Sequence, residues 1–158
     1  MNMTRSGAKA LLAGALSALA LSAGAAAQAV PALPAVHKSG SVEYLSGGVG
    51  RDEAQAIEAA ATHWPLTLEF AIKDGHRADF DADVKVTVRD AKGHAALEAT
   101  AAGPFLLAKL PAGRYSVYAT LAGKKLHERV VVKAGHPAKA VFLWPAGTGE
   151  SHVGQAHS

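Results

Sequence analysis

The residues of this chain best suited to chemistry are its histidines. The 158-residue sequence contains eight of them and no cysteine. Neutral imidazole is a common ligand of copper and zinc, so one hypothesis is a copper- or zinc-binding protein that uses surface histidines. The histidines are nevertheless scattered singly along the chain, at His37, His63, His76, His94, His127, His136, His152 and His157. We therefore expect solvated histidines, predict no metal ligands, and keep metal binding as the alternative function.

The sequence contains no recognisable catalytic grouping. A zinc peptidase needs closely spaced histidine and glutamate ligands and one open coordination position. The stretch "HERVV", which begins at His127, lacks the second histidine of the His-Glu-x-x-His pattern. No serine belongs to a motif that would link it to a general base. We therefore predict no catalytic residues, no cofactor and no enzymatic activity.

The stretch "DFDAD" places three aspartates at alternate positions, as at the start of a calcium loop: Asp79, Asp81 and Asp83. An EF-hand needs glycine at its sixth position and glutamate at its twelfth. This chain has Val84 and Asp90 there. The alternating pattern of a strand also begins at Val84. We therefore interpret these aspartates as a solvated entry into that strand.

The glycines of "SGGVGRDE" suggest a phosphate loop, because a helix N-terminus attracts anions. No Gly-Lys-Ser/Thr follows, and Asp52 and Glu53 would repel a phosphate. A nucleic-acid partner would require a concentrated basic face. Lys124-Lys125 is the only adjacent basic pair, and Glu128 lies close behind it. We predict neither nucleotide nor nucleic-acid binding.

The first 27 residues have the pattern of a secretory signal peptide. Arg5 and Lys9 precede an apolar run, and small residues provide a cleavage site after Ala27 or Ala29. The run is shorter than the ~20 residues that a membrane-spanning helix needs. The formal net charge of +3 includes both cations, so the mature chain is nearly neutral. We predict a periplasmic or secreted protein without stable membrane insertion.

Three regions are expected around a single folded domain. Residues 28–50 contain prolines and glycines and indicate a linker with a short extended piece at Val42–Leu45. Residues 51–64 have apolar side chains at helical spacing, which predicts a short helix that packs on the sheet edge through Ile57 and Trp64. The closing residues, 146–158, indicate a flexible tail.

From Pro65 to Pro145 the hydrophobic period changes to two, which predicts strands. Turns rich in Gly, Pro and Asp separate seven short segments and indicate an all-β, antiparallel sandwich. In the "LPAG" turn we expect Pro111 to fix φ and Gly113 to adopt a conformation that other residues resist. The apolar faces of the strands include Phe70, Val86, Ala95, Leu97, Tyr115 and Val117.

The stretch "FLLAKLPAGRYSVYATLAGKK" resembles the signature of carboxypeptidase regulatory-like domains, in which a Leu-Pro-x-Gly-x-Tyr-x-Val hairpin follows a strand. The matching residues are Leu110, Pro111, Gly113, Tyr115 and Val117, and the resemblance extends over residues 82–132. It implies a seven-stranded, transthyretin-like (Ig-like) sandwich in a small exported bacterial protein. It does not imply peptidase activity, because in that family the module is an accessory domain or stands alone.

These features together predict a non-catalytic, exported binding or accessory module of the cell envelope. Its partner would be another protein or an envelope polymer. We expect exposed Tyr118 and the outward faces of the edge strands to support strand addition by that partner.

Overall fold

The computed structural model describes residues 24, 32–73 and 83–149. Nearly all of the predicted signal peptide and the end of the predicted tail lie outside these ranges, as do Asp79, Asp81 and three of the histidines (His76, His152 and His157). No helix in the described ranges is long and apolar enough to cross a membrane.

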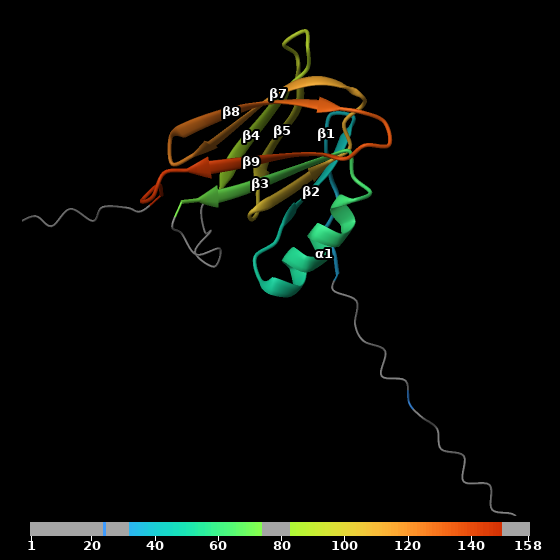
Figure 1. The fold of residues 1–158 in the computed structure, drawn as a ribbon, viewed down its shortest axis with the longest axis vertical. Coiled ribbons are helices and arrows are strands. Elements are labelled where there is room, and N and C mark those ends of the chain that lie inside the picture. The colour runs from blue at the N-terminus through green and yellow to red at the C-terminus, as the bar shows by residue number, and fades with distance from the viewer. Residues whose placement is uncertain (1–23, 25–31, 74–82, 150–158) are drawn as a thin grey trace, which may run out of the picture.

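The described chain is all-β apart from one short helix, as the sequence predicted. Two sheets face each other (Figure 1), with the strand orders β1-β2-β6-β3-β9 and β5-β4-β7-β8. The strands are β1 (His37–Ser39), β2 (Val42–Gly47), β3 (Leu66–Ile72), β4 (Val84–Arg89), β5 (Ala95–Ala101), β6 (Phe105–Ala108), β7 (Gly113–Leu121), β8 (Lys124–Val132) and β9 (Ala138–Trp144).

The predicted count of seven strands is wrong, because the described residues form nine. The two additional strands, β1 and β2, lie in the region predicted to be a linker, and β2 includes the short extended piece that was expected at Val42–Leu45. β2 pairs with β6, with Tyr44 opposite Ala108, and it buries Val42 and Leu45. The glycines that punctuate this region suggested a loop, but they flank β2 and do not interrupt its hydrogen-bonded pairing.

The prediction of a purely antiparallel sandwich also needs correction. β9 runs parallel to β3, with Leu66 opposite Ala138 and Ile72 opposite Trp144. The remaining named pairs are antiparallel. An alternating pattern identifies a strand and its buried face, but it contains no information about the direction of the neighbouring strand.

The core between the sheets follows the predicted alternation, with Phe70, Val86 and Val117 all buried. One strand departs from it. A β-bulge between Val88 and Arg89 shifts the register of β5, so that Ala95 is exposed while Ala96 packs against the core. An extra residue of this kind reverses the faces of the residues beyond it.

The helix α1 (Arg51–Ala61) packs on the outer face of the five-stranded sheet, where it contacts β2 and β6. It buries Ile57 in a second apolar cluster with Leu45, Trp64, Phe105 and Leu107. The predicted anchors, Ile57 and Trp64, are confirmed. The helix covers the sheet face and not its edge, however, and it ends at Ala61, before the predicted limit at Trp64.

At the other end of the sandwich, the chain continues beyond the predicted domain limit at Pro145. Thr148 is buried, and both its backbone N–H and its hydroxyl donate to the Pro145 carbonyl. This turn extends the described domain to Gly149.

Tyr115 explains the spacing of the "LPAGRY" hairpin. Its hydroxyl donates a hydrogen bond of 2.7 Å to the Pro111 carbonyl, so the side chain stabilises the turn that precedes β7. Burial, and secondarily the charge of Asp90, raises the pKa of Tyr115. The expected special conformation of Gly113 is wrong, because Gly113 lies outside the positive-φ region and is the first residue of β7.

The β7–β8 hairpin contains a backbone conformation that its sequence does not favour. Ala122 has φ 48° and Gly123 has φ 77°, which matches a two-residue hairpin turn with positive φ at both positions. Among the described residues, Ala122 is the only non-glycine with positive φ. Asparagine tolerates this conformation better than alanine does.

We predict that Ala122→Asn raises the free energy of unfolding by about 0.5–1 kcal/mol, because it relieves strain without touching the core. Chemical denaturation of the purified protein measures this change. Gly123→Ala is the matched control and should lower the same free energy by about 1 kcal/mol. An Ala122→Asn variant no more stable than the parent would contradict the turn geometry.

Ser46 joins β2 to the segment before β6. Its buried hydroxyl donates to the Phe105 carbonyl and accepts from the Ala102 N–H, each over 2.8 Å. Both of its hydrogen-bond partners, Phe105 and Ala102, lie more than fifty residues away in the sequence. The Ser46 hydroxyl therefore has a structural role, because it links β2 to two backbone groups that are distant in the sequence.

Replacing Ser46 by alanine should lower the free energy of unfolding by about 1–3 kcal/mol, because two backbone groups lose their partner. The same substitution at Ser116, on the outer face of β7, should change it by less than about 0.5 kcal/mol. Parallel denaturation curves of the two variants provide the comparison. Equal effects would show that the Ser46 bridge is not formed.

Candidate functional site

The outer face of the four-stranded sheet is the most distinctive polar surface of the described chain. Alternate residues of each strand point outward there, and the register places them in rows. We call this surface the basic face. It consists of Glu98 and Thr100 of β5; Lys85, Thr87 and Arg89 of β4; Arg114, Ser116, Tyr118 and Thr120 of β7; and Lys125, His127, Arg129 and Val131 of β8.

Positive charge dominates this surface. All of its lysines and arginines are exposed, and Glu98 is its only carboxylate. Within the described residues, the cations of the face make no ion pair. Arg89 is held in place differently, by donating from Nη1 to the Gly93 carbonyl over 3.0 Å. The face therefore gathers five of the cations of a chain whose formal net charge is only +3.

Four of the five cations form two rows with a column of hydroxyls between them, and the fifth, Arg114, lies on β7 at one end of that column. Residues four apart on one strand are separated by about 13 Å, and β4 lies about 10 Å from β8 because one strand separates them. Lys85 and Arg89 border one side, and Lys125 and Arg129 border the other. The intervening strand, β7, presents the hydroxyl groups of Ser116, Tyr118 and Thr120.

The centre of the basic face is ordered by ring stacking. Tyr118 and His127 are directly opposite in the register, and their rings stack with centroids 4.5 Å apart and an interplanar angle of 9°. The Lys125 Nζ lies 5.8 Å from the centroid of the Tyr118 ring. These contacts favour one mutual arrangement of the Tyr118, His127 and Lys125 side chains.

Two sequence expectations about this surface are wrong. Adjacent basic residues were a poor guide to charge concentration, because cations at alternate positions of three strands gather on one face. Tyr118 was also expected to be exposed and to support strand addition by a partner, but it is half-buried. It lies on β7, which is paired on both sides, so no partner strand can be added beside it.

The glycine-rich segment before α1 is occupied by the chain itself. The Gly48 N–H donates to Glu53 Oε1 over 2.7 Å. A Cβ at Gly48 would lie 2.6 Å from the Phe105 ring, and one at Gly103 would lie 2.5 Å from the Gly47 carbonyl oxygen. Close packing therefore explains why Gly48 and Gly103 have no side chain. The Glu53 carboxylate already accepts the hydrogen bond of the Gly48 N–H.

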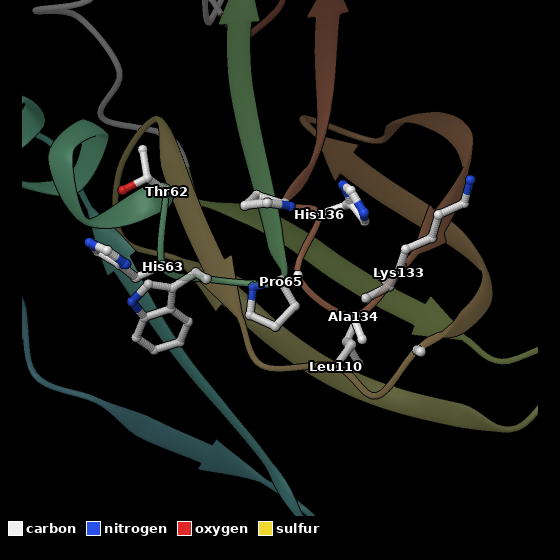
Figure 2. A pocket seen from close by; sticks show the side chains of 12 residues that line it. Thr62, His63, Pro65, Leu110, Lys133, Ala134 and His136 are labelled. Carbon is white, nitrogen blue, oxygen red and sulfur yellow. The ribbon is translucent and has the colours of Figure 1, made fainter.

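A pocket of about 420 Å³ brings together two of the histidines, His63 and His136. Figure 2 shows their rings on opposite sides of the pocket, with Pro65 between them. In the described part of the chain, no group of three or more His, Asp or Glu residues is arranged to hold a metal ion. A structural zinc site uses four ligands, so this pair alone does not form one.

A second hollow, of about 560 Å³, lies between α1 and the start of β9. Ile57, Phe105 and Ala138 are among its lining residues. Farther along β9, Val141 and Leu143 are 50% and 55% exposed. At the mouth of the hollow, Lys139 is paired with Glu69 over 2.7 Å. This surface is more apolar than the basic face, but nothing in the structure indicates what would cover it.

Comparison with known proteins adds no relative to these observations: no family model matches the chain, and no curated protein matches it significantly.

A charged contact supports the wall of the histidine pocket. Lys109 Nζ lies 2.9 Å from Glu43 Oε2 and 4.9 Å from the centroid of the Trp64 ring, and Trp64 lines that pocket. The hydrogen bond from Lys109, followed by its charge, lowers the pKa of Glu43, and the charge of Lys38 makes a smaller contribution in the same direction.

Lys109→Met should raise the pKa of Glu43 towards its ordinary value, and Lys38→Met should raise it less. Carboxyl titration by NMR measures both shifts. A lowered pKa in the folded state stabilises the fold at neutral pH, and this stabilisation is lost as the pH falls through that pKa. The Lys109→Met variant should therefore show a weaker loss of stability on acidification. A larger pKa shift in Lys38→Met would contradict the assigned contact.

Proposed function

We propose that this protein is an exported, non-catalytic binding module of the cell envelope that engages another protein or an envelope polymer through its basic face. The observation that carries the proposal is the gathering of exposed cations on one sheet face, with a single carboxylate among them. A surface of this kind attracts and orients an oppositely charged partner.

The proposal includes a periplasmic or secreted location and membership of the carboxypeptidase regulatory-like group with its transthyretin-like sandwich. Export is supported by the charged, apolar and small-residue segments of residues 1–27. The two facing sheets are compatible with the sandwich that the resemblance implies, although the described residues form nine strands and not seven. Since a fold does not determine a function, the basic face carries the argument and the family does not.

The alternative of a copper- or zinc-binding protein gains no support from the described histidines. His63 and His136 share a pocket without a third ligand there, and the His127 ring is stacked on Tyr118. His94 has Asp90 as a neighbour, 3.8 Å away, in an exposed turn. None of these arrangements provides the ligand number of a specific metal site.

The proposal is tested by following the full chain in a Gram-negative host and then using the processed protein as bait. We expect the periplasm to contain a form that has lost residues 1–27 or 1–29, as measured by intact mass. Immobilised processed protein should retain one envelope component, and Lys125→Glu/Arg129→Glu should lose it.

The control variant for this experiment is Arg51→Glu/Lys73→Glu, which changes the net charge equally at exposed positions outside the basic face. It should retain the component. Full-length protein confined to the cytoplasm, or equal retention by both variants, would overturn the proposal.

A further inference from the structure

We propose that the basic face binds a linear acidic polysaccharide that lies along β7. This inference rests on the proposed function and specifies the chemical class of the partner. It is carried by the arrangement of the charges and hydroxyls of the face, and it does not depend on the identity of the family.

The charge of the face indicates a negatively charged partner. Lys85, Lys125 and Arg129 are exposed and make no ion pair within the described residues. A partner with carboxylate or phosphate groups would find these cations solvated and available. Each such contact is weak at an exposed site, so useful affinity requires several contacts at once.

The spacing of the charges indicates a polymer and not a small anion. A single carboxylate contacts donors at about 3 Å, whereas the four cations of the two rows are about 10–13 Å apart along and across the strands. Lys85 and Arg89 therefore reach different charges, as do Lys125 and Arg129. A chain with repeated negative charges can satisfy both rows when it runs between them.

The column between the rows suits a sugar backbone. Ser116, Tyr118 and Thr120 provide hydroxyl groups that can both donate and accept hydrogen bonds, which matches the hydroxyls of a polysaccharide. Non-specific binding of single-stranded nucleic acid relies on aromatic faces on which bases stack. Here the ring of Tyr118 already stacks on His127.

A membrane surface matches the face less well. Binding at a lipid interface combines electrostatic attraction with burial of apolar side chains. The hydroxyl column and the cation rows contain no large aliphatic residue, and the exposed Val131 lies at the end of the face, opposite Arg114. The observations therefore favour an acidic polysaccharide over a nucleic acid or a lipid bilayer.

The test is calorimetric titration of the processed protein with polygalacturonate, a linear polyuronate, at low ionic strength. We expect binding that weakens steeply as salt is added. Lys125→Glu/Arg129→Glu should weaken it by about tenfold or more, because reversed charges repel the polymer. Tyr118→Phe keeps the ring but removes one hydroxyl, and it should weaken binding by about two- to tenfold.

Control measurements make the test specific. Neutral dextran should not bind, and Arg51→Glu/Lys73→Glu should bind polygalacturonate as the parent does. If the double glutamate variant does not fold, Lys125→Gln/Arg129→Gln removes the same two cations without introducing repulsion, and its affinity should also fall.

Three results would overturn the inference: no binding of polygalacturonate at low salt, equal weakening in both double glutamate variants, or tighter binding of an oligothymidylate or of phosphatidylglycerol vesicles. The first and third of these leave the proposed function intact if the exported protein still retains a protein partner through the basic face. Failure of export would instead contradict the proposed function, whereas the calorimetric result would remain valid as evidence on polysaccharide binding.

Discussion

Burial of β6 on both of its faces is the constraint on which the rest of the structure depends. Leu106 and Ala108 point into the core between the sheets, whereas Phe105 and Leu107 contact the cluster beneath α1. An antiparallel strand commonly has one solvated face. This one has none, so the helix must cover it. The five-stranded sheet is thus a middle layer, with α1 on one side and the four-stranded sheet on the other (Figure 1).

This layering determines which surfaces remain for a partner. The helix covers the β2–β6 part of one sheet, and no element of the described residues packs on the outer face of the four-stranded sheet. Hydrogen bonds tie the two sheets together at both sides of the sandwich: Trp144 Nε1 donates to the Lys124 carbonyl, and the Glu98 N–H donates to Ser39 Oγ. The strands that carry the basic face are therefore held to the other sheet at both sides of the sandwich.

Much of this arrangement could be predicted from the sequence, because alternating residues report burial directly. The faces of β4 and β7 followed from that pattern, as did the anchors Ile57 and Trp64. Where glycines surround a strand, as at β2, the pattern indicated only a short extended piece within a linker, and it could not show the bulge that changes the register at Ala95. It also could not show that β9 runs parallel to β3, since strand direction depends on partners far away in the sequence.

The basic face was missed for a related reason. Only basic residues that are adjacent in the chain were considered as a sign of concentrated charge. The pairing of β4, β7 and β8 brings more distant cations onto one face, namely Lys85, Arg89, Lys125 and Arg129. The signal was present in the outward positions of each predicted strand, and assigning a sheet order to those strands would have revealed it. The scattered positions of the histidines likewise did not show that His63 and His136 line one pocket.

The central claim is that a partner engages the outer face of the four-stranded sheet, and mapping of backbone amide shifts by NMR tests it most directly. Polygalacturonate added to isotope-labelled, processed protein should perturb amides of β4, β7 and β8, centred on Tyr118 and His127. Perturbations confined to α1, β9 and the hollow between them would contradict the account.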